Sequence, residues 1–494
     1  MKTLRLTILY IIFFNTTSLL AQMQLGKSIF GYVSGYNAIR GMSLSNDGTH
    51  VVIGSTYEDL TGEHSGQVRV FEWENNNWYQ IGQTIKGQDG DYFGKCVDIS
   101  KDGNIIAVGA LETGGWGDIL GWVSVYQLVG DQWLQLGDTI KGDDAAGMHG
   151  YAVSISEDGL TVAIGSENST GGLGRIRVFR FQNGIWDKLG DTFIGTSAND
   201  NIGRNVSLSA NGNRVAFGIQ GATGPLGEIF MGFCQVWELV GNSWVQLGNN
   251  IYGEAPYNAF GWSVELAGSG NRLVASSVRN NDGGEDAGHA RVFEYISGDW
   301  QQLGDDVDGE AAYEHCGSSV SLSYDGNILA IGANRSNQNG FLDGGSTRVL
   351  KLENDAWIQI TPTIYGNLEY QSLGDVVCLS ASGDRIAISS PGQADPSLQM
   401  PRFTQVFQLP VASKVQTPLH ISFSVFPNPN SGVFRIEGIG SGLVQLFDSM
   451  GRLQRTWRGN NSVFDISDLP VGMYQVSVST GEETWTQLIL KKNP

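Results

Sequence analysis

The residues able to do chemistry in this chain are numerous, but they form no familiar catalytic pattern. Six histidines are scattered without ligand spacing, and neither a nucleophile elbow nor a phosphate-binding loop occurs. The 50 acidic side chains offer many carboxylate pairs, and a glycosidase needs two held about 5 to 10 Å apart in a cleft. We interpret most of these carboxylates as solvated surface groups and predict that the chain is not an enzyme.

Three tyrosines are better candidates for a binding site. Tyr257, Tyr313 and Tyr370 lie in the segments EAPYNA, EAAYEH and NLEYQS, each three residues before the next unit of an internal repeat. Aromatic rings amid carboxylates and amides can stack on sugars or frame a peptide. The alternative, in which these tyrosines pack between repeat units, stays open. We predict them as tentative ligand-binding residues for an extracellular glycan or protein.

The elements that must position these residues follow from the repeat itself. Seven turn glycines recur every 53 to 58 residues: Gly48, Gly103, Gly159, Gly212, Gly270, Gly326 and Gly383. Six tryptophans run in phase with them: Trp78, Trp133, Trp186, Trp244, Trp300 and Trp357. Each unit holds four short runs, such as GYAVSISEDG, TVAIG, GRIRVFRF and GIWDKLGDTFIG, with the alternation typical of strands. The pattern predicts an all-β fold, a seven-bladed β-propeller whose tryptophans pack blade against blade.

The two ends of the repeat predict how the ring closes. Seven units carry the first hairpin, but the last one lacks the tryptophan-containing fourth strand. The N-terminal segment QLGKSIFG, residues 24–31, matches WLQLGDTIKG of the second unit without its tryptophan. We expect this N-terminal strand to complete the last blade, because closure removes exposed strand edges.

Composition and the N-terminus indicate the compartment. The net charge is −20, and Lys and Arg clusters able to bind phosphates are absent, so we predict no nucleic-acid partner. Lys2 and Arg5 precede an apolar run, and a plausible cleavage site follows Ala21, as in a secretory signal peptide. No other stretch is apolar enough to span a bilayer. The four cysteines, Cys96, Cys234, Cys316 and Cys378, are expected to be buried free thiols.

The repeat resembles a known family. Phe93-Gly94, a DG turn, VGALETGG and GWVSVYQL are similar to the FG-GAP repeat of integrin alpha-subunit propellers, and Phe260-Gly261 repeats the opening pair. The order VSLSxDG, VAIG, VRVFE also resembles a WD-repeat blade. FG-GAP repeats often carry a calcium loop, but turns such as SKDGN and SGSGN offer one Asp or none, whereas calcium prefers six to eight oxygen ligands. We therefore expect neither a metal nor a cofactor.

The C-terminal segment resembles the type A sorting domain of the type IX secretion system. The matching sorting-motif residues are Phe426, Pro427, Asn428, Pro429, Leu469, Pro470, Gly472, Tyr474, Lys491 and Lys492. Between them, turn residues separate short alternating strands such as VFRIEG and LVQLFD, which predicts a small β-sandwich. The resemblance implies passage through the type IX machinery, removal of this domain, and release or surface anchoring.

The predicted organisation is a signal peptide (1–21), a propeller (22–411), a linker (412–420) and a sorting domain (421–494). We predict that the protein passes through the periplasm and is secreted or displayed on the cell surface. We expect the propeller to be a binding or adhesion module. Two alternatives stay open, an extracellular polysaccharide-active hydrolase or lyase, and a purely structural surface protein.

Overall fold

A computed structural model of the chain describes residues 22–30, 41–111, 120–143, 147–167, 172–197, 200–392, 402–410, 424–426, 431–437, 442–448, 452–459, 463–480 and 483–492. It divides into two compact units, Met1–Val411 and Ala412–Pro494. The predicted signal peptide and the predicted linker lie outside the described residues.

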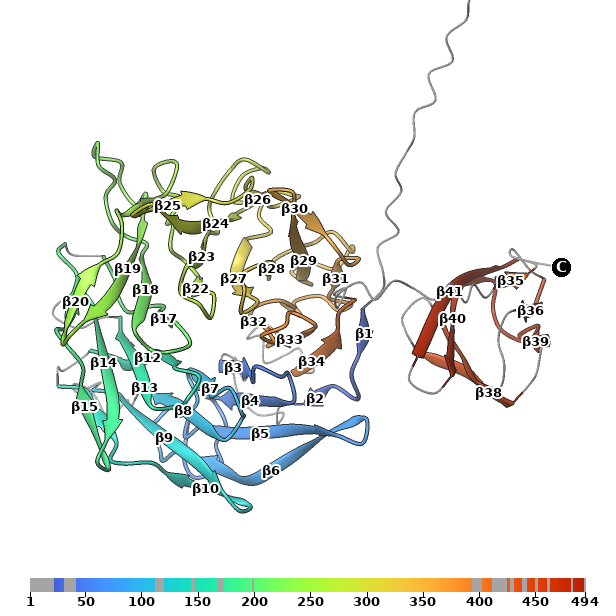
Figure 1. The fold of residues 1–494 in the computed structure, drawn as a ribbon, viewed down its shortest axis with the longest axis horizontal. Coiled ribbons are helices and arrows are strands. Elements are labelled where there is room, and N and C mark those ends of the chain that lie inside the picture. Colours follow the sequence, from blue (N-terminus) through green and yellow to red (C-terminus); the bar gives the residue numbers. More distant parts are fainter. Residues whose placement is uncertain are drawn as a thin grey trace, which may run out of the picture. The chain divides into compact units, whose positions relative to one another are not determined.

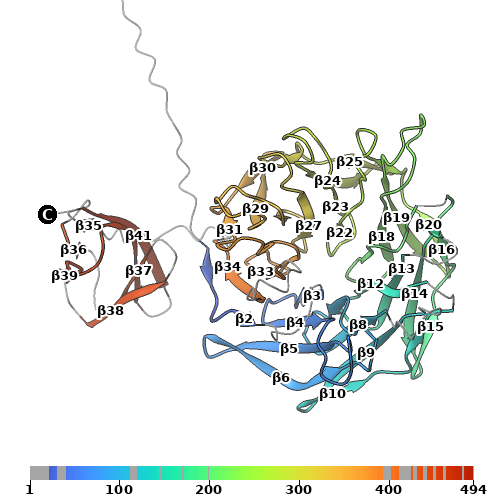
Figure 2. The same ribbon diagram turned by 180° about the vertical axis from the view of Figure 1, so that it is seen from behind.

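The first unit contains seven antiparallel sheets that follow one another around a ring, each with its first strand innermost (Figures 1 and 2). Blade 1 contains β3 (Gly41–Leu44), β4 (His50–Ser55), β5 (Gln67–Glu74) and β6 (Asn77–Lys86). Blade 2 contains β7 (Val97–Ile99), β8 (Ile105–Ala110), β9 (Trp122–Val129), β10 (Gln132–Gln135) and β11 (Ile140–Lys141). Blade 3 contains β12 (His149–Ile155), β13 (Thr161–Ser166), β14 (Arg175–Gln182), β15 (Ile185–Lys188) and β16 (Phe193–Ile194).

The remaining blades repeat this order. Blade 4 contains β17 (Ser207–Leu208), β18 (Arg214–Ile219), β19 (Phe233–Val240), β20 (Ser243–Gln246) and β21 (Ile251–Tyr252). Blade 5 contains β22 (Val264–Leu266), β23 (Arg272–Ser277), β24 (His289–Ile296), β25 (Asp299–Gln302) and β26 (Val307–Asp308). Blade 6 contains β27 (Cys316–Leu322), β28 (Ile328–Ala333), β29 (Ser346–Glu353), β30 (Ala356–Gln359) and β31 (Ile364–Tyr365). Blade 7 contains β32 (Val377–Leu379), β33 (Arg385–Ser390) and β34 (Phe403–Gln408), together with β1 (Met23–Gln24) and β2 (Ile29–Phe30).

The N-terminal segment closes the ring as predicted. Both β1 and β2 pair antiparallel with β34, in the registers Met23↔Gln408 and Ile29↔Thr404. Buried Leu25 and Ile29 join a hydrophobic cluster that also contains residues of blades 7 and 1. The first and last repeats are therefore joined by strand pairing and by a shared core, so the edge of blade 7 is covered.

The six repeat tryptophans join blades 1 to 6 each to the preceding blade. Each of the six indole N–H groups donates a hydrogen bond to an outer-strand carbonyl of the preceding blade, over 2.7 to 3.1 Å. Trp78 of blade 1 donates to Leu25 at 3.0 Å, so the N-terminal strand takes the place of an outer strand in this series. The predicted blade-to-blade packing of the tryptophans is confirmed.

The fourth strand differs from the expectation in its continuity. In blade 3 the predicted single run from Trp186 to Gly195 is two short strands, β15 and β16, which both pair with β14. The break occurs at Gly190, whose φ of 69° is left-handed. A Cβ there would lie 2.6 Å from the Trp244 ring of the next blade, so only glycine admits the tryptophan.

A ring of side chains on the innermost strands joins every blade to the next. We call it the bridging ring, and its members are Ser43, Asp98, Ser154, Ser207, Glu265, Ser321 and Cys378. Glu265, for example, accepts a hydrogen bond from the backbone N–H of Leu322 at 3.0 Å, and Cys378 closes the circle by donating to the Met42 carbonyl at 3.3 Å. Burial is the main cause that raises the pKa of Glu265 to about 8.

The second unit has a core between two antiparallel sheets. One contains β35 (Ser424–Phe426), β36 (Val433–Glu437) and β39 (Val463–Asp465). The other contains β37 (Gly442–Asp448), β38 (Leu453–Gly459), β40 (Gly472–Thr480) and β41 (Glu483–Lys491). Phe434 and Phe464 of the first sheet pack with Leu446 and Val476 of the second, all four nearly inaccessible to solvent. This is the small β-sandwich that the sequence predicts.

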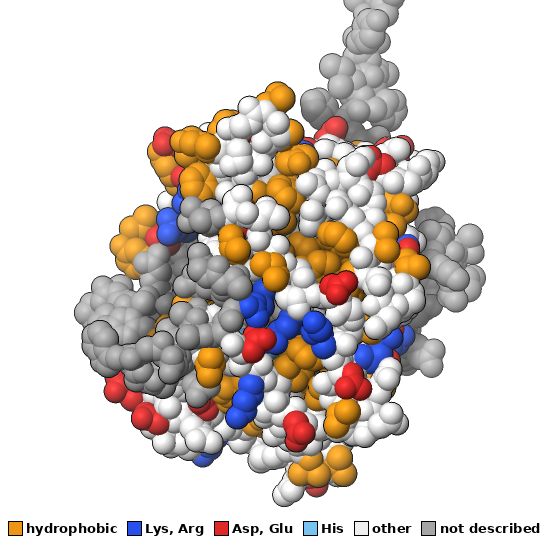
Figure 3. All heavy atoms as spheres, turned by 90° about the vertical axis from the view of Figure 1, so that its left-hand side faces the viewer, with side chains coloured by type: hydrophobic (Ala, Val, Ile, Leu, Met, Phe, Trp, Pro, Cys, Tyr) orange, Lys and Arg blue, Asp and Glu red, His pale blue; other side chains and the backbone are white. Residues whose placement is uncertain are grey.

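The surface of the propeller is chemically mixed, and its cysteines are unpaired. On the side of the ring seen in Figure 3, hydrophobic side chains are scattered among polar and charged ones. All four cysteines are free, Cys234 and Cys316 being buried and the other two partly buried. Burial raises the pKa of Cys96 to about 12, so its thiol stays protonated. Within the described residues, no helix has the length and apolar character needed to cross a membrane.

Candidate functional site

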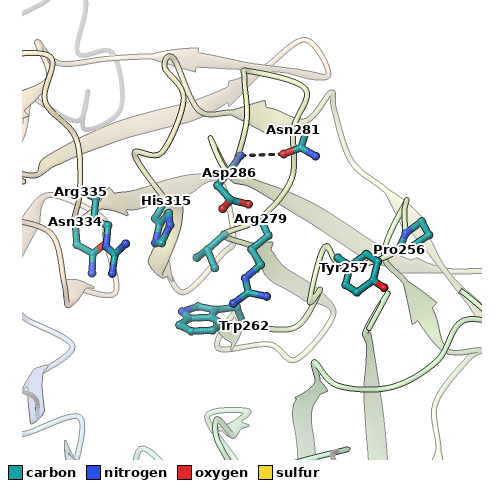
Figure 4. Close-up of a pocket in the computed structure, with 10 residues that line it drawn as sticks. Pro256, Tyr257, Trp262, Arg279, Asn281, Asp286, His315, Asn334 and Arg335 are labelled. Carbon is teal, nitrogen blue, oxygen red and sulfur yellow. Dashed lines mark hydrogen bonds between the residues drawn. The ribbon is translucent and has the colours of Figure 1, made fainter. Parts of the chain in front are cut away.

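An open cleft of about 580 Å³ lies where loops of blades 5 and 6 meet on one face of the propeller. Its lining residues are Pro256, Tyr257, Trp262, Val278, Arg279, Asn281, Asp286, His315, Asn334 and Arg335. In Figure 4, Arg279 extends toward the Trp262 ring, and His315 stands between Asp286 and the pair Asn334 and Arg335. The cleft therefore combines two aromatic rings, two guanidinium groups, a carboxylate and an imidazole.

The connections between blades place the first part of this set. The segment between β21 and β22 carries Tyr257, which has a left-handed φ of 66° and donates its backbone N–H to the Ile229 carbonyl at 2.9 Å. The next residue, Asn258, is buried, and its carbonyl accepts a hydrogen bond from Ser277. These bonds hold the connection against the β18–β19 loop and the end of β23, and they leave Tyr257 54% exposed.

The loops after the second strands supply the charged part. Arg279, Asn281 and Asp286 belong to the β23–β24 loop, where the Asn281 side-chain oxygen accepts the Asp286 backbone N–H at 2.9 Å (Figure 4). Asn334 and Arg335 follow β28 of the next blade, and the Asn334 amide donates to Asp375 at 2.7 Å. The other side-chain atom of this amide, Oδ1, is buried and has no hydrogen-bond partner among the described residues.

The electrostatics of the cleft favour an anionic ligand. Among the described residues, neither Arg279 nor Arg335 forms an ion pair within 4.0 Å, although the chain carries a net charge of −20. Burial lowers the pKa of His315, and the charges of Arg335 and Arg279 lower it further, against the opposite effect of Asp286. His315 is thus neutral near pH 7 and can accept a proton. Guanidinium groups bind carboxylates with two parallel hydrogen bonds.

The three predicted tyrosines do not gather in one place. Tyr257 lines the cleft, but Tyr313 and Tyr370 are not among its lining residues. Tyr313 is 51% exposed, and its hydroxyl donates to Glu285. Each tyrosine has a left-handed φ and a backbone N–H that donates to a loop of the preceding blade. Their ligand-binding role stays a prediction, and Tyr257 is the one with a pocket beside it.

Sequence reasoning missed most of the cleft. Arg279 and Arg335 lie in two loops that vary in sequence between blades, and neither was predicted as a site residue. His315 is one of the six scattered histidines, and Trp262 does not belong to the series of repeat tryptophans. A usable signal existed, because an arginine stands at the corresponding place after the second strand in blades 5 and 6 only.

Four of the sorting-motif residues are joined by hydrogen bonds around the turn before β40, namely Leu469, Pro470, Tyr474 and Lys491. The buried Lys491 ammonium donates to the backbone carbonyls of Ser467 and Leu469, and the Tyr474 hydroxyl donates to the Pro470 carbonyl at 2.7 Å. Gly472 begins β40, and Lys492 is exposed after β41. Phe426 ends β35, whereas Pro427, Asn428 and Pro429 lie outside the described residues. Lys491 thus connects the end of β41 to the turn before β40.

Comparison with known families assigns the C-terminal segment. Residues 424–492 match the secretion system C-terminal sorting domain. The chain is accordingly handled by the type IX secretion machinery and reaches the outer cell surface or the medium. No curated protein is significantly similar to the chain. The resemblance of the repeats to the FG-GAP type stays a prediction.

Solved structures similar to this chain are propellers of low sequence identity. A putative 6-phosphogluconolactonase from Bacteroides uniformis has a TM-score of 0.47 and 13% identity, over 69% of this chain and 88% of that chain. The periplasmic gluconolactonase of Pseudomonas aeruginosa has a TM-score of 0.46 and 14% identity, over 71% and 96%. The β-propeller domain of Cps50 (Swd1) from Myceliophteria thermophila has a TM-score of 0.47 and 8% identity, over 78% and 100%.

These structures correct one prediction. The expectation that the chain is not an enzyme is overturned, because two of these three propellers are named as lactonases. The inference failed because it took the lack of a familiar catalytic motif as a sign of a non-catalytic protein, whereas a propeller can host many different functions. At these identities the similarity concerns the fold alone and assigns no lactone substrate to this chain.

Proposed function

We propose that the exported propeller recognises an acidic polysaccharide at the cleft between blades 5 and 6. The observation that carries this proposal is the pair Arg279 and Arg335, both without an ion-pair partner among the described residues and both lining a cleft with Trp262 and Tyr257. A uronate residue presents one carboxylate for a guanidinium and one apolar sugar face for an aromatic ring. Removal of the C-terminal domain after export would leave this propeller as the working protein.

Binding to polysaccharides with and without uronic acid tests this proposal. Affinity electrophoresis or calorimetry with the purified propeller should detect saturable binding to the acidic polymers alone. Arg279→Ala and Arg335→Ala should each weaken it by about tenfold to a hundredfold, the range expected for a hydrogen bond to a charged group. Lys188→Ala is the control, because it removes one positive charge from β15 of blade 3, which contributes no residue to the cleft. It should leave the affinity for the acidic polymers unchanged. Equal binding by all variants, or none by the wild type, refutes the proposal.

His315 favours a second candidate function, a lyase acting on the same polymer. A neutral imidazole can take the proton from the carbon that carries the uronate carboxylate, while an arginine neutralises the charge of that carboxylate. The electron pair of the broken C–H bond then forms a double bond to the neighbouring carbon. The glycosidic C–O bond at that carbon breaks, and its oxygen takes a proton from water. His315→Asn should abolish formation of the unsaturated product, followed by ultraviolet absorbance, and keep binding intact. If the wild type binds the polymer and forms no product, the lyase function is refuted and only the recognition function remains.

A further inference from the structure

A second group of side chains lies beside the cleft and belongs to none of the functions above. Glu254, Asp282, His289 and Asp306 each offer one ligand atom, and these four atoms lie within 4.8 Å of one another. Glu254 follows β21 of blade 4, whereas the other three belong to blade 5. Strands and loops of two neighbouring blades therefore converge on one point.

The central residue of this group is a buried histidine without a hydrogen bond. The His289 side chain has no solvent exposure, and neither ring nitrogen has a hydrogen-bond partner among the described residues. Its Nδ1 nevertheless lies 3.3 Å from an Asp306 oxygen and 3.6 Å from a Glu254 oxygen. A buried imidazole that makes no hydrogen bond is costly, and a nitrogen that faces several carboxylate oxygens is a usual arrangement of metal ligands.

The spacing of these atoms fits a small divalent ion. Bonds of about 2.1 Å in a tetrahedron put neighbouring ligand atoms about 3.4 Å apart, close to the two His289 separations. Calcium is a poorer fit, because it prefers six to eight oxygen ligands at longer distances. One imidazole with three carboxylates is a mixed donor set that suits Zn²⁺ or Mn²⁺.

Neighbouring groups hold these ligands in place. Gln302 donates its amide to one Asp306 oxygen at 2.6 Å, which leaves the other oxygen facing His289. The buried Asn280 amide donates to both Glu254, at 3.3 Å, and Asp282, at 3.1 Å. Hydrogen bonds of this kind orient ligating side chains in metal sites.

The other blades show what this position contains when no such group is present. The counterparts of Asp306, two residues after the outer-strand glycine or its equivalent, are Thr84, Thr139, Thr192, Asn250 and Thr363. The counterparts of His289, one residue after the glycine before the third strand, are Gln67, Trp122, Arg175, Phe233 and Ser346. Blade 5 alone among these combines an acid with a histidine, so the group does not follow from the repeat.

We propose that Glu254, Asp282, His289 and Asp306 bind one divalent first-row metal ion of the Zn²⁺ or Mn²⁺ type. The ion links the connection from blade 4 to the β23–β24 loop, the two segments that supply Tyr257 and Arg279 to the cleft. The site does not depend on what the cleft binds. The expectation of no metal came from the hairpin turns, and this site lies elsewhere in the blade.

Metal binding to the full chain tests the proposal directly. After treatment with a chelator, titration with ZnCl₂ and with MnCl₂ should show one ion per chain, with an accompanying rise in the thermal midpoint. Asp306→Thr and His289→Gln install residues found at the same places in other blades, so the fold should tolerate them. Each should weaken binding at least about a hundredfold, since even the loss of a supporting residue costs 10- to 100-fold.

A matched control separates the site from general acidity. Glu310 follows β26 of blade 5 as Glu254 follows β21 of blade 4. Glu310 lies 3.5 Å from Arg348, and Glu254 lies 3.5 Å from Arg291. Glu310→Gln should leave metal affinity unchanged. Absence of bound ion in the wild type, or equal affinity in His289→Gln and the wild type, overturns the proposal. Circular dichroism and urea midpoints establish that both ligand variants are folded.

Discussion

Replacing Glu265 in the bridging ring by glutamine should make the propeller less sensitive to alkaline pH. The carboxyl lies in β22 and accepts hydrogen bonds from the Leu322 backbone at 3.0 Å and the Ser321 hydroxyl at 3.2 Å. Burial outweighs these bonds, and the pKa of Glu265 rises from 4.5 to about 8. The folded protein therefore holds a proton that the unfolded chain releases.

The sign and size of the effect follow from this difference. The stabilisation from the bound proton is complete below pH 4.5 and is lost as the pH rises to about 8. One pKa unit corresponds to about 1.4 kcal/mol, so the wild type should lose about 4 kcal/mol between pH 5 and pH 8 through this group. Glutamine keeps an oxygen acceptor and has no proton to lose. The free energy of unfolding of Glu265→Gln, measured relative to that of the wild type, should therefore rise by a similar amount between pH 5 and pH 8.

Urea unfolding followed by tryptophan fluorescence at pH 5, 6.5 and 8 measures this advantage. Asp325→Asn is the control, because the hydrogen bonds that Asp325 accepts from Ser323 and Asn327 lower its pKa despite partial burial. That carboxyl is ionised in both states throughout the interval, so its replacement should shift stability by a constant. An advantage of Glu265→Gln that does not change with pH, or that shrinks as the pH rises, refutes the reasoning.

Two further predictions concern the ends of the chain. Deleting residues 23–31 should lower the thermal midpoint of the whole propeller, because blade 7 loses two paired strands and Trp78 loses its acceptor, whereas unchanged unfolding would contradict the closure. Removing residues 421–494 should make the protein accumulate in the periplasm of a host with type IX machinery, as fractionation and immunoblotting would reveal, and normal delivery of the truncated chain would contradict the sorting role.

Local pattern and repetition in the sequence determined most of the architecture. Alternating runs, turn glycines and phased tryptophans encode a blade within some 55 residues, and QLG at the N-terminus matches the outer strand that blade 7 lacks. The tryptophan contact is repeated at six of the seven junctions, so one rule predicts all six. The sorting domain could equally be predicted from the sequence, because its motif residues, such as Lys491 and Tyr474, donate hydrogen bonds to the backbone of one turn.

Only the tertiary structure decided which side chains share a site. Arg279, His315 and Arg335 belong to different loops, and the ring brings them together at the junction of blades 5 and 6. The proposed metal ligands likewise come from two blades, since Glu254 follows blade 4 and His289 belongs to blade 5. Neither set has a sequence spacing of its own, because the path of each loop depends on left-handed residues such as Tyr257 and on contacts with the neighbouring blade. Strand periodicity specifies which face a side chain takes, and the closed ring alone specifies its neighbours.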